Sequence, residues 1–167
     1  RAGFEYAKAN FKKFGLGLEL SKKQRLVMTG NQAIAVGALA ANCRFYSAYP
    51  MTPATSILHF LAPNGPKNGM FVKQCEDEIA AVAMAIGAAQ TGARAMTGTS
   101  GGGFSLMTEA VGLAGMIETP VVIVNVQRGG PSTGLPTKTE QGDLFQVLGA
   151  SQGEYPRVIL APSTFED

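Results

Sequence analysis

The chain is poor in the residues that usually hold metals. Its 167 residues include no tryptophan, a single histidine and two cysteines. Cys43 and Cys75 are isolated and lack C-x-x-C spacing, which argues against an iron–sulfur, zinc or dithiol site, so we interpret both as small buried hydrophobic residues. His59 lies in an apolar run without an acid or a cysteine at ligand or triad spacing. We therefore expect His59 on a helix surface.

Long hydrophobic runs are also missing. No apolar stretch approaches the roughly 20 residues that span a bilayer, and no charged start followed by an apolar block marks a signal peptide. The composition, 46% hydrophobic and 16% charged, is nevertheless ample for a buried core. We predict one soluble, cytoplasmic domain without membrane contact.

Charge is small in sum but uneven along the chain. The formal net charge is +2, yet residues 1–25 hold seven of the 14 basic residues. No basic stripe or base-stacking motif accompanies them, so we expect no nucleic-acid partner. We interpret residues 1–24 as a basic linker or connector and residues 25–167 as the domain. The S-x-x-E spacing of residues 163–166 is typical of a helix start, so we expect the domain to continue beyond Asp167.

The hydrophobic period alternates between strand and helix along the body. Strands alternating with helices of this length predict an α/β fold, with an open, mostly parallel, doubly wound sheet and helices on both faces. The helices at 31–42, 77–90 and 103–117 carry alanine and glycine on several sides, so we expect a second subunit to cover them. The alternative is tight packing of these helices against the sheet alone. The predicted strands are 25–28, 45–48, 70–74, 94–97, 120–126 and 157–160, and the predicted helices are 31–42, 53–61, 77–90, 103–117 and 141–148.

Four polar clusters each follow one of the apolar, strand-like runs. In an open parallel sheet, the carboxyl ends of the strands form the crevice in which ligands bind. These clusters therefore predict a site at that edge. They are Tyr49-Pro50-Met51-Thr52-Pro53, Glu76-Asp77-Glu78, Thr99-Ser100-Gly101-Gly102-Gly103, and Gln127-Arg128-Gly129-Gly130-Pro131-Ser132.

Two of the charged side chains in these clusters, Glu78 and Arg128, are candidates for chemistry. Glu78 stands in a first helical turn, where the helix N-terminus favours a carboxylate by roughly 0.3–1 kcal/mol. Because an apolar helix follows, its carboxyl group can also be buried beside a ligand and serve as an acid or a hydrogen-bond partner. Arg128 can clamp a carboxylate with two hydrogen bonds. Its alternative is a surface salt bridge to Glu140 or Asp143.

The other two clusters are less specific. Thr52 lies between two prolines, which can direct its hydroxyl towards an anion or simply form a rigid turn before a helix. The turn at 99–103 can offer backbone N–H groups to a polar ligand. It has neither the G-K-[ST] of a P-loop nor the G-x-G-x-x-G of a dinucleotide fold, which disfavours a dinucleotide-binding enzyme.

Longer segments carry a family resemblance. They read TGNQAIAVGALAANCRFYSAYPMTPAT, EDEIAAVAMAIGAAQTGARAMTGTSGGGFSLMTEAVGLAGMIETPVVIVNVQRGGPSTGLPTKTEQGDL and GEYPRVILAPS. They begin at Thr29 and end at Ser163, and the run 30–161 within them resembles the thiamine diphosphate pyrimidine-binding domain of the α subunit of 2-oxoacid:ferredoxin oxidoreductases, especially the 2-oxoglutarate type. The basic N-terminal segment resembles the connector to a preceding γ-type domain in fused α chains.

The resemblance implies a function and a set of roles. The reaction would be the coenzyme A-dependent oxidative decarboxylation of a 2-oxoacid, such as 2-oxoglutarate to succinyl-CoA, with ferredoxin as electron acceptor. Glu78 would be catalytic, because the family's matching glutamate bonds the pyrimidine ring and favours its imino form. Thr52 and Arg128 would contact the oxoacid. The cofactor would also be bound by Tyr49, Pro50, Thr99, Ser100 and Gly101.

The resemblance also implies partners. The chain lacks a diphosphate-and-magnesium motif and cluster-binding cysteines, so Mg and the iron–sulfur cluster would reside on a β subunit that shares the thiamine diphosphate. The protein would be a hetero-oligomer, and this polypeptide alone would be inactive. Ala54 and Asn125 depart from the family's usual residues, which bears on substrate choice. One alternative is a preference for pyruvate or branched-chain oxoacids. The other is that the chain is a non-catalytic α/β interaction module.

Overall fold

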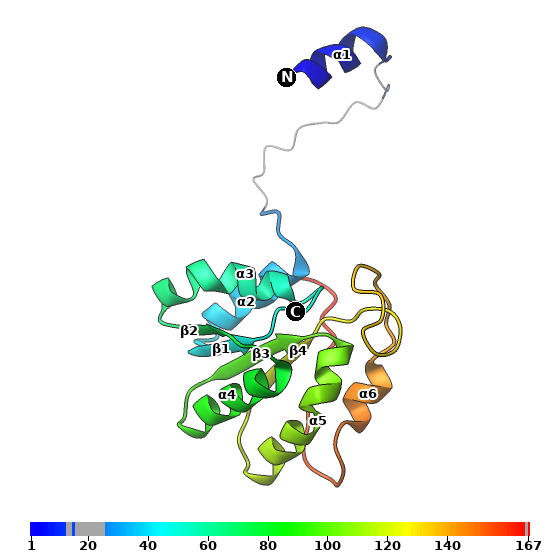
Figure 1. Cartoon of the computed structure of the whole chain (residues 1–167). Helices are drawn as coiled ribbons and strands as arrows, with labels where there is room; N and C mark the ends of the chain where they lie inside the picture. The colour runs from blue at the N-terminus through cyan, green and yellow to red at the C-terminus, as the bar shows by residue number, and fades with distance from the viewer. Residues whose placement is uncertain (13–14, 16–25, 166) are drawn as a thin grey trace.

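The fold is an open parallel sheet between two layers of helices. The computed structural model describes residues 1–12, 15, 26–165 and 167. In chain order the elements are α1 (Ala2–Asn10), α2 (Gly30–Ala40), β1 (Phe45–Ala48), α3 (Thr55–Asn64), the 3-10 turn η1 (Pro66–Asn68), β2 (Phe71–Gln74), α4 (Glu78–Gln90), β3 (Ala95–Thr99), α5 (Gly101–Met116), β4 (Val122–Asn125) and α6 (Leu144–Gly149). Figure 1 shows α2 and α3 on one face of the sheet and α4 and α5 on the other. The predicted doubly wound α/β fold is confirmed.

The order of the strands determines where a ligand crevice can form. All pairings are parallel, and the order is β2-β1-β3-β4. From β1 the chain proceeds to β2 on one side, whereas β3 pairs with β1 on its other side. The loops that leave β1 and β3 therefore diverge, and the crevice of such a sheet opens between their carboxyl ends.

Two of the helices start with side-chain caps. Thr29 precedes α2, and its hydroxyl accepts a hydrogen bond from the Gln32 amide at 3.3 Å while Gln32 Oε1 accepts one from the Thr29 amide at 2.9 Å. Asp77 precedes α4 and accepts from the Ala80 amide at 2.7 Å. A side-chain cap of this kind stabilises a helix by about 1 kcal/mol. The Asp77 cap fixes the start of α4 and thereby places Glu78 in its first turn.

Two predicted strands are wrong. Residues 26–28 and 157–160 belong to no strand, and Arg25 lies outside the described residues. An apolar pattern forms a strand only where a neighbouring backbone pairs with it, and nothing in the described part of the chain pairs with either segment. Their apolar side chains are instead largely exposed: Leu26 86%, Val27 98%, Val158 85% and Leu160 82%.

The helix start predicted at residue 163 is likewise not formed among the described residues. The amides of Ser163 and Thr164 both donate to Asp167 Oδ2 at 2.7 Å, and the segment is a turn. The acceptor of these bonds is Asp167 rather than the glutamate of the S-x-x-E spacing. Residue 166 lies outside the described residues.

The core has one part on each face of the sheet. One part gathers Tyr46, Ile57 and Met96 with the α2–α3 layer, and the other gathers Val82 and Met107 with the α4–α5 layer. Both cysteines are buried free thiols, and the histidine is exposed on α3, as predicted. Burial raises the pKa of the Cys43 and Cys75 thiols.

The N-terminal helix contributes nothing to this core. α1 has no buried residue. The predicted boundary at residue 24 falls in 16–25, which lie outside the described residues, so it stays a prediction. No helix among the described residues is both long and apolar enough to cross a membrane.

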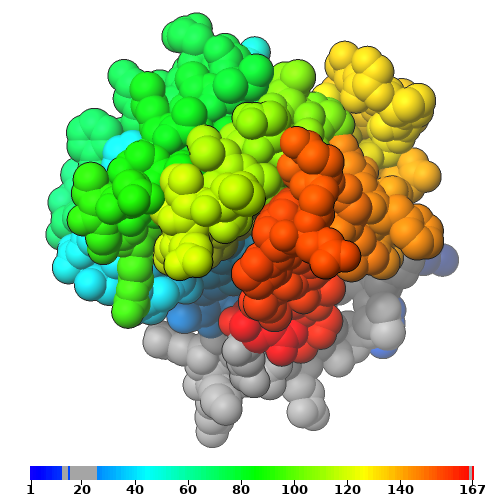
Figure 2. Space-filling view, turned by 90° about the horizontal axis from the view of Figure 1, so that it is seen from below, coloured from blue at the N-terminus to red at the C-terminus, as the bar shows by residue number. Residues whose placement is uncertain are grey.

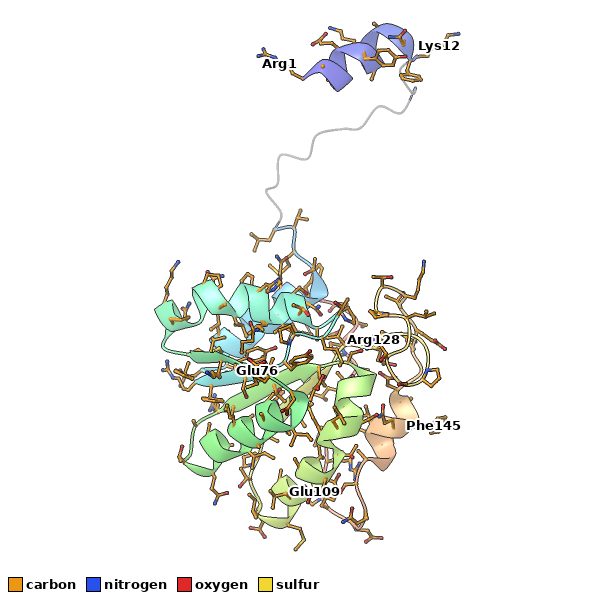
Figure 3. The ribbon with its side chains drawn as sticks, viewed as in Figure 1. Arg1, Lys12, Glu76, Glu109, Arg128 and Phe145 are labelled. Atoms are coloured by element: carbon orange, nitrogen blue, oxygen red, sulfur yellow. The ribbon has the colours of Figure 1, made fainter. Side chains whose placement is uncertain are left out.

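The outer surface of the α4–α5 layer is apolar in part. Figure 2 shows the segment after α6 running beside α5, and the Tyr155 ring lies 2.7 Å from where a side chain at Gly115 would begin. Figure 3 shows Phe145 projecting from α6, where it is 85% exposed. Further exposed apolar residues are Ile79, Met84, Leu106, Leu113 and Met116. Within this chain the small-residue helices are covered on one side, and the second subunit predicted to cover the other side stays a prediction.

Candidate active site

The first turn of α5 is built from three glycines, each of which makes room for a different group. A Cβ added at Gly101 would stand 2.6 Å from Asp143 Oδ2, and one at Gly102 would stand 3.0 Å from the Ser132 carbonyl oxygen. A Cβ at Gly103 would stand 2.7 Å from Glu78 Cγ and 2.8 Å from Glu78 Oε1, and nearer still to Thr99 Oγ1. Real Cβ atoms essentially never come within 3.0 Å of another atom. A side chain at Gly101 or Gly103 would therefore displace a neighbouring side chain, whereas one at Gly102 would make a tight contact.

Glu78 lies buried against the Gly103 side of this turn. Only 4% of the residue is exposed, and its Oε1 is enclosed without a hydrogen-bond partner in the described part of the chain. A buried carboxyl oxygen left unpaired is costly, by about 1–3 kcal/mol or more. The N-terminal dipole of the 16-residue helix α5 offsets part of that cost, because it favours a nearby carboxylate. The oxygen can thus accept a hydrogen bond from a donor that is not among the described residues, such as one on a bound molecule.

The end of β3 adds further buried hydroxyl groups. Thr99 and Ser100 are fully buried. The Thr99 hydroxyl lies 3.7 Å from Met51 Sδ, which links the end of β3 to the loop after β1. Ser100 precedes α5 without capping it, and its Oγ has no partner among the described residues.

Arg128 is buried, and its guanidinium group reaches the loop after β1. The residue is 8% exposed, and Nη1 donates to the Thr52 carbonyl oxygen at 2.8 Å. Its Nε is enclosed and has no partner in the described chain. The alternative of a surface salt bridge to Glu140 or Asp143 is wrong, because the arginine is buried and its hydrogen bond goes to a backbone carbonyl.

The loop after β1 is itself held by α2. Asn31 Nδ2 donates to the Pro53 carbonyl oxygen at 2.9 Å and to Ser56 Oγ at 2.7 Å. The Thr52 side chain is exposed, Pro50 is half-buried, and Tyr49 is 37% exposed. The start of α2 thus holds the backbone next to the Thr52 carbonyl oxygen, which accepts the hydrogen bond from Arg128.

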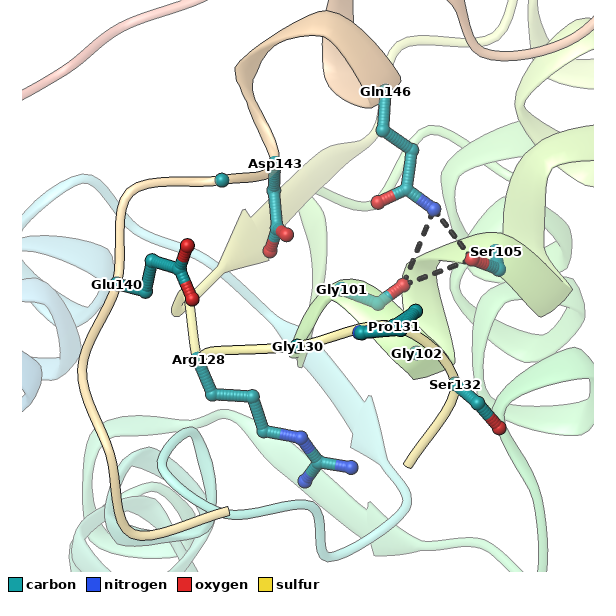
Figure 4. A pocket seen from close by; sticks show the side chains of 11 residues that line it. Gly101, Gly102, Ser105, Arg128, Gly130, Pro131, Ser132, Glu140, Asp143 and Gln146 are labelled. Carbon is teal, nitrogen blue, oxygen red and sulfur yellow. Dashed lines mark hydrogen bonds between the residues drawn. The ribbon is translucent and has the colours of Figure 1, made fainter. Parts of the chain in front are cut away.

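A cavity of about 470 Å³ opens beside Arg128. Figure 4 shows its lining, in which Arg128 faces the glycine turn while Asp143 and Gln146 approach from the start of α6. Gln146 Nε2 donates to the Gly101 carbonyl oxygen at 3.3 Å and to Ser105 Oγ. The lining holds one cation and two acids: Gly101, Gly102, Ser105, Arg128, Gly130, Pro131, Ser132, Glu140, Gly142, Asp143 and Gln146.

The structure brings the predicted site residues together in two groups. Glu78 meets Thr99 across Gly103, and Arg128 meets Thr52, with the first turn of α5 between the two groups. Of the residues that were assigned a predicted role, only Gly101 and Arg128 line the cavity. Among the described residues, no group of three or more His, Cys, Asp or Glu side chains is placed to hold a metal ion.

Sequence reasoning missed four residues at this site. Gly103 and Met51 were within the predicted clusters but received no role, and their contacts depend on tertiary placement. Gln146 carried no signal. Asp143 was considered only as a partner for Arg128, yet its Oδ2 accepts from Asn125 Nδ2 at 3.1 Å.

Comparison with known proteins gives the family. Residues 36–167 match the family described as "Pyruvate flavodoxin/ferredoxin oxidoreductase, thiamine diP-bdg". The chain is 52% identical over 140 residues to the 2-oxoglutarate synthase subunit KorA of Methanocaldococcus jannaschii, a match that covers 84% of this chain and 38% of that protein. It is 45% identical over 161 residues to the 2-oxoacid:ferredoxin oxidoreductase 1 subunit alpha of Sulfurisphaera tokodaii, with 89% and 26% covered.

A solved structure agrees with these relatives. The 2-oxoglutarate:ferredoxin oxidoreductase from Magnetococcus marinus, with 2-oxoglutarate, coenzyme A and succinyl-CoA bound, superposes with a TM-score of 0.89 at 43% identity. The match covers 99% of this chain and 29% of that one. The chain spans well under half the length of the relatives it matches, 41% of the KorA subunit of Archaeoglobus fulgidus for example. The chain belongs to the pyruvate flavodoxin/ferredoxin oxidoreductase family, in the part that carries its thiamine diphosphate-binding domain.

Proposed function

We propose that this chain is the pyrimidine-binding part of the α subunit of a 2-oxoacid:ferredoxin oxidoreductase. The reaction is the coenzyme A-dependent oxidative decarboxylation of a 2-oxoacid, with 2-oxoglutarate, which yields succinyl-CoA, as the preferred substrate and ferredoxin as the electron acceptor. The observation that carries the proposal is the buried Glu78 carboxyl group with an unpaired Oε1 beside a glycine-lined helix start. The relatives named for this activity support it.

The residues present fit thiamine diphosphate. An enclosed carboxyl oxygen without a partner suits a ring nitrogen that donates a hydrogen bond, and Ser100 Oγ at the start of α5 is likewise enclosed without a partner among the described residues. Glu78, Thr99, Ser100 and Gly101 would hold the pyrimidine half, with Tyr49 and Pro50 on the β1 side. When bound, thiamine diphosphate supplies a nucleophilic carbon and accepts the electron pair released by decarboxylation.

Three side chains of this chain have separate roles in the proposed reaction. Glu78 Oε1 accepts the hydrogen bond of a ring nitrogen and so selects the ring's protonation state, which is a form of acid–base catalysis. Arg128 binds the oxoacid carboxylate, because a guanidinium group with an unpaired Nε in a buried setting offers a strong, directional hydrogen bond. Thr52 presents its exposed hydroxyl group to the same substrate.

The proposal includes partners that supply what this chain lacks. A β subunit holds the diphosphate, the Mg ion and the iron–sulfur cluster, and it covers the exposed apolar side chains of α4 and α5. Electrons leave through that cluster to ferredoxin, and coenzyme A takes the acyl group. The assembled enzyme works in the cytoplasm.

Replacement of Glu78 tests the mechanism. In the purified full complex, Glu78→Gln should lower 2-oxoglutarate-dependent ferredoxin reduction by about 100-fold or more, the usual contribution of a positioned acid or base. Glu76→Gln is the matched control, because Glu76 is an exposed acid in the same cluster. Undiminished turnover in the Glu78 variant, with the complex intact by size-exclusion chromatography, would reject the role assigned to Glu78.

Substrate choice needs a separate experiment. The wild-type complex should be offered 2-oxoglutarate, pyruvate and branched-chain oxoacids in parallel, with acyl-CoA products identified by mass spectrometry. We expect succinyl-CoA to form fastest. Equal rates on all three substrates would contradict the preference, and faster acetyl-CoA formation would reassign it to pyruvate.

A further inference from the structure

The loop that carries Arg128 is closed at its base by side chains. This loop, residues 127–143, leaves the sheet after β4 and returns at the start of α6. Gln127 Oε1 accepts from the Asp143 amide at 3.0 Å, and Asn125 Nδ2 donates to Asp143 Oδ2 at 3.1 Å. We call these two hydrogen bonds the Asp143 clasp. The first bond joins the two ends of the loop to each other, and the second joins Asp143 to the end of β4, just before Arg128.

The interior of the same loop forms its own small hairpin. The Gly129 amide donates to the Lys138 carbonyl oxygen at 2.9 Å, and the Leu135 amide donates to the Gly129 carbonyl oxygen at 2.7 Å. The hairpin thus begins one residue after Arg128. Any displacement of the loop's base therefore acts on the backbone on both sides of the arginine.

The Asp143 carboxylate also rests on the start of α5. A Cβ at Gly101 would stand 2.6 Å from Oδ2 and 2.7 Å from Oδ1, so the carboxylate occupies the space that the glycine leaves. A negative charge there is favoured by the helix N-terminus, and Ser100 supplies no side-chain cap. Figure 4 shows Asp143 at the cavity wall, with Arg128 and Glu140 as the other charged groups of the lining.

We propose that Asp143 is a positioning residue, which holds the Arg128 loop closed so that the guanidinium group meets Thr52 and faces the cavity. The inference rests on the proposed function for its kinetic consequence, although the clasp itself can be measured without turnover. Asp143 acts through Arg128, and substrate need not touch it. Loss of the clasp lets the loop open and misaligns the arginine that binds the oxoacid carboxylate.

The clasp is tested by changing Asn125 and Asp143, which form its side-chain to side-chain hydrogen bond. In the full complex, Asp143→Ala should raise the KM for the oxoacid by about tenfold with little change in kcat, because the ground-state carboxylate contact weakens. Asn125→Asp should do the same, since two carboxylates would then face each other. The double variant Asn125→Asp/Asp143→Asn restores one carboxylate and one amide in exchanged places, and should return KM to within about twofold of wild type.

Hydrogen exchange provides a readout that needs neither substrate nor activity. In the resting complex, the Gly129 and Leu135 amides should exchange at least about tenfold faster in both single variants and at the wild-type rate in the exchanged pair. Glu109→Gln is the control, because it removes an exposed acid from the same helix α5 and should change neither quantity.

Two results would overturn the proposal. One is wild-type KM and exchange rates in Asp143→Ala, and the other is an exchanged pair as defective as the single variants. If the Asp143→Ala complex does not assemble, the Asn125→Asp variant and the exchanged pair still test the proposal. A wild-type complex that oxidises no 2-oxoacid would refute the proposed function, while the exchange rates would still test the clasp.

Discussion

Substitution of Gly103 by alanine should impair the enzyme although it replaces no proposed reactive group. The added Cβ would stand 2.7 Å from Glu78 Cγ and 2.8 Å from Glu78 Oε1, whereas ordinary contact begins at 3.4 Å. Glu78 must therefore retreat by about 0.7 Å, and Thr99, which is nearer still, must turn. A misplacement of about 1 Å in a catalytic arrangement can cost about 100-fold in rate. We expect kcat for oxoacid-dependent ferredoxin reduction to fall by roughly 10- to 100-fold.

The Gly103 variant should still fold, because the net loss of stability is modest. Overpacking a buried site costs about 1–3 kcal/mol, and the better helix propensity of alanine returns up to about 1 kcal/mol. Gly87→Ala provides the control, because a Cβ at Gly87 meets no atom within 4 Å. That control should retain full kcat and gain up to about 1 kcal/mol in the free energy of unfolding. Wild-type kcat in the folded Gly103 variant would refute the assignment of Glu78.

Three further predictions concern stability and reactivity in the assembled protein. Thr29→Ala removes the hydroxyl of a capping box and should lower the free energy of unfolding by about 1 kcal/mol in urea denaturation. Burial raises the pKa of Tyr46, so the unfolded chain loses that proton first and wild-type stability should fall as pH rises above about 10. Tyr46→Phe should flatten this fall between pH 9 and 11, and a slope equal to wild type would contradict the reasoning. Iodoacetamide at pH 8 should label neither Cys43 nor Cys75 until denaturant is added, because burial raises both thiol pKa values and blocks access. Labelling is read by mass spectrometry. Rapid labelling of the folded protein would count against this prediction.

The alternation of strand and helix was readable from the sequence because each element obeys its own period. The strand 45–48 was predicted with the bounds it has, and Asp77 marked the start of α4. The apolar pairs Leu26-Val27 and Val158-Leu160 failed as strands for a physical reason. Periodicity reports which residues can line a strand, but a strand also needs a neighbouring backbone, and that depends on the tertiary arrangement.

Several candidate site residues could be named from the sequence, but their contacts could not. Position at a strand end pointed to Glu78, Thr52 and Arg128, and the structure buries the glutamate and joins the other two. The roles of the three glycines of α5 depend on which groups the fold packs against each side of one helical turn. Asp143 looked like an ion-pair partner because it carries the opposite charge to Arg128, yet a neutral amide from β4 binds it instead.

The hydrogen bond from Arg128 ends on the carbonyl oxygen of residue 52, an atom that every amino acid possesses. Replacement of the threonine hydroxyl during evolution would leave the arginine's anchor intact. Under the function proposed above, the side chain at residue 52 can therefore change while Arg128 stays in place, so the two proposed substrate contacts can evolve separately.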